Sequence, residues 1–376
     1  MHGVPSTDDK RDAAARDLDE RIRHFITAPR SEHVAFERLA LEVFAYQHER
    51  NEPYRRYCDR YGKGPTDVRS WRNVPAVPAA SFASARLACF PPERTLLTFE
   101  SSGTTSGGQK PSTHELDSPK LYDASLLAHF RQRVLPDATS MRLIALGPPF
   151  DEADRSSLSY MVSKVSAVLG EPGGGFFVRD GRLAFEALCA ALAEDARPVV
   201  VFGTAFAFVH LFDRCARDSV KFTLPIGSRV IETGGFKGKS REITRKELYD
   251  GFAEHLGVPR VLCASEYGMC ELTSQWYDAN IEDYFAGRPP RVDVKVGPHW
   301  ARATIVDPVT AEPVAAGVEG LVKIFDLSNR GSVASVLTAD VARERDGGFE
   351  LLGRFAGALP KGCSIAVDAL LGSADD

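Results

Sequence analysis

Between about residue 140 and residue 268, short apolar runs alternate with segments of helical periodicity. The apolar runs are "MRLIALG", "RPVVVFGT", "SRVIETGG" and "RVLCASEYG". Helical spacing marks 182–196 and 240–257, which lie between these runs. Such a β-α-β rhythm predicts a largely parallel sheet covered by helices, and hence an α/β fold.

The apolar runs end in small or polar residues, for example Gly203-Thr204, Thr233-Gly234-Gly235 and Ser265-Glu266. Open α/β sheets bind ligands beyond the carboxyl ends of their strands. We therefore expect these ends to converge on one site.

The flanking regions have different patterns. Residues 8–60 have helical spacing, and shorter strands are expected from about residue 300, with a turn at Asp346-Gly347-Gly348. We expect an N-terminal helical segment over 1–70, an α/β core over 71–335 and a short β-rich segment over 336–376.

Composition excludes several classes of protein. Of the 376 residues, 44% are hydrophobic and 26% charged, and with a net charge of −5 there is no basic excess that would suggest a surface for nucleic acid, although a local basic patch remains open. No apolar run reaches the roughly 18–20 residues of a membrane span, and the N-terminus lacks the apolar core of a signal peptide, so a cytoplasmic protein is expected. Seven cysteines without a CxxC motif favour neither disulfides nor zinc.

The loop "SSGTTSGGQK" (101–110) is rich in hydroxyl groups and glycine and ends in Lys110. Exposed backbone N–H groups, short hydroxyls and a lysine suit phosphate oxygens. A Walker A motif is excluded, because Gln109 stands at the lysine position and Pro111 follows Lys110. The alternative is a flexible surface turn.

This loop resembles the phosphate loop of the acyl-adenylate-forming superfamily. "SEYGMCE" (265–271), "LTAD" (337–340) and "LLGRFAG" (351–357) resemble its other motifs in the required order. "SSLSYM" (156–161), "ETGGFKGKSREI" (232–243), "EYGMCELTSQWY" (266–277) and "KGCS" (361–364) resemble the acyl-protein synthetase family within it. The resemblance covers roughly residues 80–370.

The resemblance implies a large adenylate-forming domain with ATP and Mg²⁺ as cofactors. A carboxylic acid, fatty or related, is joined to AMP and its acyl group then passes to a thiol. Lys110, Thr104 and Thr105 are expected to hold phosphates, Glu271 the Mg²⁺ ion and Asp340 the ribose. The full set of implied nucleotide residues is Ser102, Gly103, Thr104, Thr105, Ser106, Thr233, Gly234, Gly235, Glu266, Tyr267, Gly268, Cys270, Asp340 and Arg354.

Two departures from the superfamily pattern stand out. Cys270 occupies the position of a phosphate-contacting threonine. The chain also ends 22 residues after Arg354, where most of the superfamily continues into a mobile domain with a catalytic lysine, so that domain is expected to be absent. Lys237, Lys239 and Lys361 remain open as substitutes.

In "LPKGCSIAVD", Cys363 stands near Lys361, and a nearby cation lowers a thiol pKa. The resemblance implies that Cys363 accepts the acyl group and passes it to a reductase or another acceptor protein. The alternative is a buried structural cysteine.

Two further features are candidates for substrate contact. The stretch "VVVFGTAFAFVHLF" (199–212) can line an acyl pocket with Phe202, Phe206 and Phe208, or form a strand followed by a core helix. His114 can orient a substrate or phosphate, or be a solvated loop histidine.

Three functions therefore compete. The first is an ATP-dependent ligase that acylates Cys363. The second is a ligase that uses coenzyme A or an amine, for which Cys363 is dispensable. The third is a non-catalytic nucleotide-binding or scaffolding protein.

Overall fold

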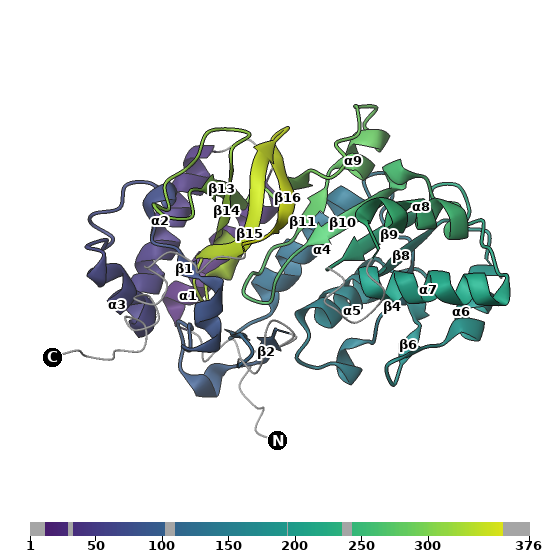
Figure 1. The fold of residues 1–376 in the computed structure, drawn as a ribbon. Coiled ribbons are helices and arrows are strands. Elements are labelled where there is room, and N and C mark those ends of the chain that lie inside the picture. The colour runs from purple at the N-terminus through teal and green to yellow at the C-terminus, as the bar shows by residue number, and fades with distance from the viewer. Residues whose placement is uncertain (1–11, 29–32, 102–109, 194, 235–242, 356–376) are drawn as a thin grey trace, which may run out of the picture. The chain divides into compact units, whose positions relative to one another are not determined.

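The structure, a computed structural model, describes residues 12–28, 33–101, 110–193, 195–234 and 243–355 (Figure 1). The chain divides into two compact units. Unit 1 comprises Met1–Ala128, Met269–Ser274 and Gly297–Asp376, and unit 2 comprises His129–Gly268 and Gln275–Val296. Within the described ranges, no helix is long and apolar enough to cross a membrane.

Unit 2 contains a mostly parallel sheet with the strand order β12-β11-β10-β9-β8-β4-β5. Strands β10, β9, β8, β4 and β5 are parallel to one another, whereas β11 pairs antiparallel with β10 and β12 pairs antiparallel with β11. The strands are β4 (Arg142–Leu146), β5 (Gly175–Phe176), β8 (Val199–Thr204), β9 (Arg229–Thr233), β10 (Cys263–Tyr267), β11 (Trp276–Asp278) and β12 (Lys295–Val296). The α/β fold expected from the sequence is confirmed.

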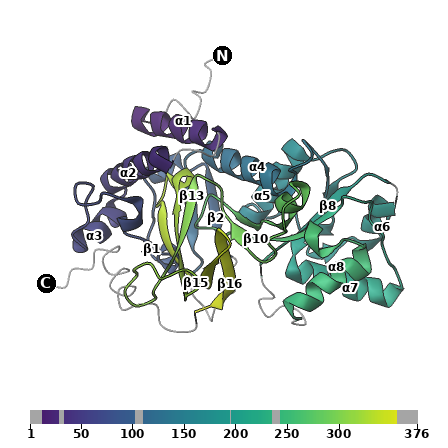
Figure 2. The ribbon, with the colours of Figure 1, turned by 90° about the horizontal axis from the view of Figure 1, so that it is seen from above.

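Helices α6 (Phe185–Ala193), α7 (Ala205–Asp218) and α8 (Arg245–Leu256) share one apolar core with strands of this sheet. Figure 2 shows α7 and α8 side by side. Local signals set their ends: Thr204 caps the start of α7, and Thr244 with Glu247 forms a capping box on α8. The helix expected over 182–196 differs, because its first residues form the short strand β7 (Arg182–Leu183), paired with β6 (Val178–Arg179).

The direction of chain winding reverses between β4 and β8. From β4 the chain runs through α5 (Ser157–Leu169) to β5, whereas from β8 it runs through α7 to β9 on the other side. Because such crossovers are right-handed, α5 lies on the opposite face of the sheet from α7. The carboxyl ends of β4 and β8 therefore form a topological switch point, where open α/β sheets bind ligands.

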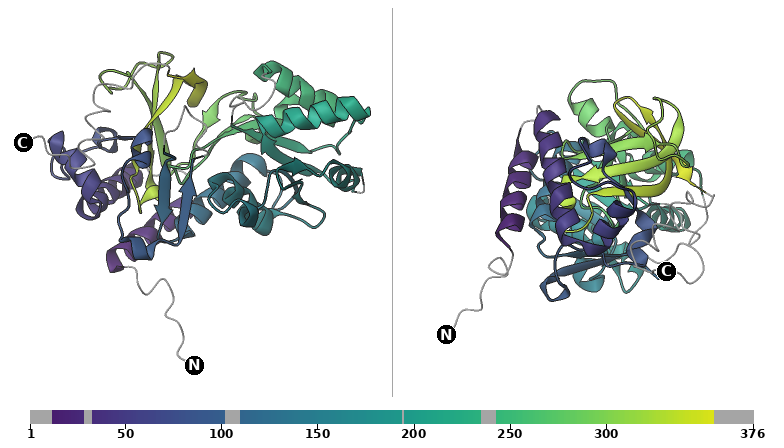
Figure 3. Two further views of the ribbon diagram at one scale, coloured as in Figure 1. Left: turned by 60° about the horizontal axis from the view of Figure 1, so that its bottom comes forward. Right: turned by 90° about the vertical axis from the view of Figure 1, so that its left-hand side faces the viewer.

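Unit 1 combines N-terminal helices with mostly antiparallel strands (Figure 3). The helices α1 (Ala13–Thr27), α2 (His33–Arg50) and α3 (Glu52–Arg60) confirm the helical pattern of 8–60. Its strands are β1 (Val77–Pro78), β2 (Leu97–Glu100), β3 (Thr113–Leu116), β13 (Ala301–Val306), β14 (Glu319–Asp326), β15 (Ser335–Arg345) and β16 (Gly348–Arg354). Phe36 of α2 contacts the rings of Trp71 and Phe325, which ties the helices to β14.

Two α-helices and several 3₁₀ turns complete the described elements. They are α4 (Lys120–Val134), α9 (Asn280–Phe285), η2 (Trp71–Asn73), η3 (Ala79–Ala83), η4 (Pro92–Arg94), η5 (Phe150–Glu152), η6 (Arg260–Leu262) and η7 (Leu327–Asn329). The predicted turn between β15 and β16 is also present, with positive φ at Asp346 and Gly347.

Candidate functional site

The polar strand ends of unit 2 lie in one row. Thr204 of β8 is the register partner of Thr233 on β9, which in turn is the partner of Glu266 on β10. The Thr233 hydroxyl donates a hydrogen bond to Glu266 Oε2. The parallel sheet thus brings together three of the strand-end residues that the sequence singled out.

Glu266 is buried, and its environment is electrostatically unusual. Burial raises the pKa of Glu266 to about 7, while the Thr233 hydroxyl and the ammonium of Lys295 oppose that shift. Gly268 is packed closely against it, since a Cβ added at Gly268 would lie 2.5 Å from Glu266 Oε1. Tyr267, between them, has its ring centroid 6.4 Å from that of Trp276.

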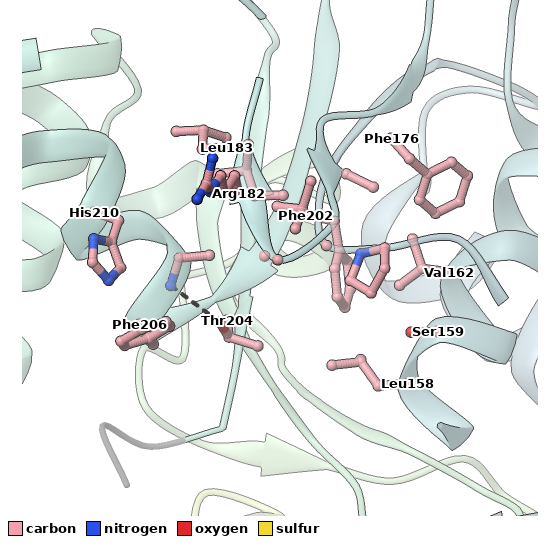
Figure 4. A pocket seen from close by; sticks show the side chains of 18 of the residues that line it. Leu158, Ser159, Val162, Phe176, Arg182, Leu183, Phe202, Thr204, Phe206 and His210 are labelled. Carbon is pink, nitrogen blue, oxygen red and sulfur yellow. Dashed lines mark hydrogen bonds between the residues drawn. The ribbon is translucent and has the colours of Figure 1, made fainter. Parts of the chain in front are cut away.

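A cavity of about 830 Å³ opens at the switch point of unit 2 (Figure 4). Its apolar wall includes Phe176, Phe202 and Phe206, and Val162 of α5 lies on the same side as Phe176 in Figure 4. The volume falls in the ~300–1,000 Å³ range of small-molecule pockets.

The predicted phenylalanines are placed differently from one another. Phe202 and Phe206 line the cavity, whereas Phe208 is fully buried in the core that α7 shares with the sheet. Phe208 therefore matches the alternative interpretation, a core helix after a strand. Polar groups at the cavity include Ser159, His210 and Arg182.

In unit 1, the strands β2 and β3 pair as an antiparallel hairpin that carries the predicted phosphate loop. The loop is closed at its base, where Ser101 N donates to Ser112 O and Ser112 N donates to Ser101 Oγ, both at 3.0 Å. Lys110 is exposed. The residues Ser102, Gly103, Thr104, Thr105 and Ser106 lie outside the described residues.

His114 is buried on β3, one residue after that strand begins, so the interpretation as a solvated loop histidine is wrong. Its Nδ1 lies 2.7 Å from Cys270 O, and because a carbonyl only accepts, Nδ1 carries the hydrogen. Burial lowers the pKa of His114 to about 4, so the ring is neutral near pH 7. His114 thus holds the Cys270 backbone without adding charge.

Cys270 and Glu271 follow β10 in a segment that belongs to unit 1, and both are buried. Cys270 Sγ lies 3.9 Å from Ser112 O, at the base of the phosphate-loop hairpin. Burial raises the pKa of the Cys270 thiol, and the neighbouring Glu271 carboxylate raises it further. The thiol therefore stays protonated and is a poor nucleophile.

Glu271 is the residue that the family resemblance assigns to Mg²⁺. Among the described residues, no group of three or more His, Cys, Asp or Glu side chains could hold a metal ion. Mg²⁺ is commonly bound by one or two carboxylates together with substrate phosphates and water, so a single carboxylate such as that of Glu271 fits this ion.

Asp340 of β15 and Arg354 of β16 are cross-strand partners. Arg354 Nε donates to Asp340 Oδ1 at 3.2 Å. The structure therefore pairs the predicted ribose-binding residue with the predicted hinge residue. Gly235, Lys237, Lys239, Lys361 and Cys363 lie outside the described residues.

Several buried polar residues next to these positions were not anticipated from the sequence. In unit 2, Lys295 Nζ lies 2.7 Å from Asp278 Oδ1 and donates to Ser265 O at 2.9 Å, which fixes the end of β10. In unit 1, Asp326 and Asn329 bind the backbone around Glu271. Their only sequence signal is the polar run "DLSNR" directly after an apolar strand.

Comparison with solved structures defines the class of fold. An open conformation of 2-hydroxyisobutyryl-CoA ligase, in complex with 2-HIB-AMP and CoA, matches with a TM-score of 0.63 and 14% identity over 86% of this chain and 71% of that one. ATP-bound MatB from Rhodopseudomonas palustris matches with a TM-score of 0.50 and 13% identity over 68% and 47% of the two chains. The fold is that of adenylate-forming ligases.

The family follows from sequence comparison. The model of the family "Acyl-protein synthetase, LuxE" matches residues 23–371. The long-chain-fatty-acid–luciferin-component ligases of Vibrio harveyi and Aliivibrio fischeri are each 22% identical, over 90% and 94% of this chain and 89% and 94% of their own length. The chain belongs to the acyl-protein synthetase (LuxE) family, and it is an ATP-dependent, AMP-forming ligase.

Proposed function

We propose that this protein activates a fatty or related carboxylic acid as an acyl adenylate and transfers the acyl group to Cys363. In the first step the substrate carboxylate attacks the α-phosphorus of ATP, and pyrophosphate leaves. In the second step the thiolate attacks the acyl carbonyl carbon, a thioester forms and AMP leaves with the bonding electrons. The family match over residues 23–371 is the observation that carries this proposal.

The site residues have complementary roles in the first step. Lys110 and the hydroxyl-rich loop neutralise phosphate charge, and Thr233, Gly234 and Tyr267 contact the adenine. Asp340 accepts hydrogen bonds from the ribose hydroxyls. Glu271 would hold Mg²⁺, an ion that neutralises phosphate charge when it is bound.

The cavity of unit 2 supports an acyl substrate. Its wall includes Phe176, Phe202 and Phe206. Binding of an acyl chain against these rings is favourable, because each apolar group of the chain is removed from water. The cavity also lies at the carboxyl ends of β4 and β8, on the sheet edge that carries Thr233 and Glu266. We propose that the acyl chain occupies this cavity.

The described cysteines support Cys363 as the acyl acceptor. Five of the six described thiols are buried, and Cys189 is partly exposed. Their environments raise the pKa of all six, by burial in the first place. None of these six is an activated thiol, whereas Cys363 has Lys361 two residues away in the sequence. A reductase or another protein that accepts the acyl group is the proposed partner.

The test is pyrophosphate exchange into ATP with a panel of carboxylic acids, followed by intact-protein mass measurement. We expect exchange with at least one acid, and a mass gain of one acyl group that hydroxylamine removes. Exchange without a mass gain, together with efficient acylation of coenzyme A or an amine, would favour the free-acceptor ligase. No exchange with any acid, with ATP binding intact, would favour the non-catalytic alternative.

A further inference from the structure

The segment that carries Glu271 is held in place by hydrogen bonds to its backbone, and not by packing alone. Residues 269–274 connect β10 to β11 and form no helix or strand. A loop of this kind keeps a side chain in place only if its own polar backbone groups have fixed partners. Four residues of the segment have such partners within unit 1.

Asp326, the last residue of β14, supplies two of these contacts. Its Oδ2 accepts hydrogen bonds from Thr273 N at 3.1 Å and Ser274 N at 2.8 Å. Its Oδ1 accepts from Ser274 Oγ at 2.8 Å, Ser328 Oγ at 2.6 Å and Ser328 N at 3.0 Å. Burial of a carboxylate is costly without such partners, and the five donors satisfy both oxygens of a side chain with no exposed surface.

Asn329, three residues later at the end of η7, supplies the contact at Glu271 itself. Its Nδ2 donates to Glu271 O at 2.9 Å and to Val333 O at 2.8 Å. The bond from His114 to Cys270 O completes the set, so the backbone is held at 270, 271, 273 and 274.

The turn that bears Asp326 and Asn329 is itself braced. Gln47 of α2, fully buried, donates from Nε2 to Asn329 O at 2.8 Å and to Arg330 O at 3.1 Å. Ala334 N donates back to Gln47 Oε1 at 3.0 Å. Arg330 in turn forms an ion pair with Asp19 of α1, in which Arg330 Nε lies 2.7 Å from Asp19 Oδ1. Rigid support of this kind is what a precisely placed metal-binding carboxylate requires.

We infer that Asp326 and Asn329 are positioning residues that fix the Glu271 segment for the adenylation step. This inference rests on the proposed function, in which Glu271 holds Mg²⁺. The two side chains contact the segment rather than the reacting groups. Their loss should therefore weaken Mg²⁺ use before it affects the rest of the fold.

The test variant is Asp326→Asn, compared with Asp307→Asn as a matched control. Asp307 also accepts hydrogen bonds from two backbone N–H groups and a hydroxyl in unit 1, but its partners are Val309 and Thr310. In Asp326→Asn, an NH₂ group replaces one of the two acceptor oxygens. This NH₂ group cannot accept a hydrogen bond. Whichever way the amide points, it faces either the backbone N–H groups of Thr273 and Ser274 or the three donors that Oδ1 binds in wild type, and those hydrogen bonds are lost.

The first measurement is hydrogen–deuterium exchange of a peptide covering 269–274, without ATP or Mg²⁺. We expect exchange about tenfold faster or more in Asp326→Asn and no change in Asp307→Asn. The second is the Mg²⁺ concentration for half-maximal pyrophosphate exchange, expected to rise about 10–100-fold in Asp326→Asn and in Asn329→Ala. If Asp326→Asn fails to fold, Asn329→Ala is measured in both assays against the same expectations.

The outcomes separate this inference from the proposed function. Unchanged exchange of 269–274 in a folded variant would overturn the positioning role, even if the wild-type enzyme is active. An unchanged Mg²⁺ requirement would do the same. If the wild-type protein shows no pyrophosphate exchange, the proposed function fails, and the hydrogen-exchange comparison alone decides whether Asp326 holds the segment.

Discussion

The protonation of Glu266 should make the stability of this protein depend on pH in a way that one substitution can remove. Its side chain is 5% exposed, and burial raises its pKa from 4.5 to about 7. Between these values the folded state keeps a proton that the unfolded state releases. Stability from this group is therefore greatest below pH 4.5 and falls as pH rises through 7.

The size of the effect follows from the shift. A change in pKa from 4.5 to about 7 corresponds to about 3 kcal/mol of lost stability above pH 7. Glu266→Gln removes the titration, and its side-chain oxygen can still accept the hydrogen bond from Thr233. In a domain of the size of unit 2, a change of 1 kcal/mol in stability shifts the Tm by roughly 2–4 °C. The Tm of Glu266→Gln should therefore rise relative to that of wild type by up to about 6–12 °C between pH 5 and pH 8.

The assay is thermal unfolding of Glu266→Gln, wild type and a control variant, Glu254→Gln, at half-unit steps from pH 5 to pH 8.5. Glu254 is exposed on α8, and its variant controls for the loss of one carboxylate from the same unit. A flat difference between Glu266→Gln and wild type, or one that becomes more negative as pH rises, would show that Glu266 is already ionised in the folded protein at pH 5.

The remaining predictions concern activity. Glu271→Gln should lower pyrophosphate exchange about a hundredfold or more while circular dichroism stays unchanged, because loss of one preorganised electrostatic group typically costs ~10²–10³ in rate; full exchange would remove Glu271 from the site. Cys363→Ser should retain pyrophosphate exchange and lose the acyl mass gain, whereas Cys189→Ser, at a partly exposed thiol, should retain both; acylation of Cys363→Ser would point to another acceptor. Phe206→Trp should shift the preferred acid to a shorter chain, because each methylene that no longer fits loses ~0.8 kcal/mol of binding; an unchanged KM series across chain lengths would place the chain elsewhere.

The sequence predicted most of the elements of this fold, because periodicity is a local property. The apolar runs became β4, β8, β9 and β10, and the helical spacing of 8–60 became three helices. The prediction was less accurate where a segment's composition suits a helix and a strand equally well. The first two residues of 182–196 form a strand because they pair with β6, a contact that helical spacing cannot show.

Side-chain direction was similarly out of reach for the stretch 199–212. Phe202, Phe206 and Phe208 are equally apolar in the sequence, yet only the first two line the cavity. Phe206 and Phe208 are two residues apart at the start of α7, which turns their side chains about 160° from each other if the helix is regular. To identify the wall of the pocket, one must know that the helix starts at Ala205 and where the sheet lies beside it. The sequence did not predict either of these with an accuracy of one residue.

The residues around Glu271 show why a motif indicates chemistry better than it indicates support. "SEYGMCE" marks Glu271 by its own letters, but the contacts that hold the segment come from His114, Asp326 and Asn329, each more than 50 residues away in sequence. Asp326 and Asn329 stand in a stretch that reads as an ordinary polar turn. Their importance follows from burial, since a carboxylate with no exposed surface that accepts five hydrogen bonds must have its donors in fixed positions. A substitution at Asp326 should therefore change how firmly the segment around Glu271 is held, although nothing in the local sequence connects the two residues.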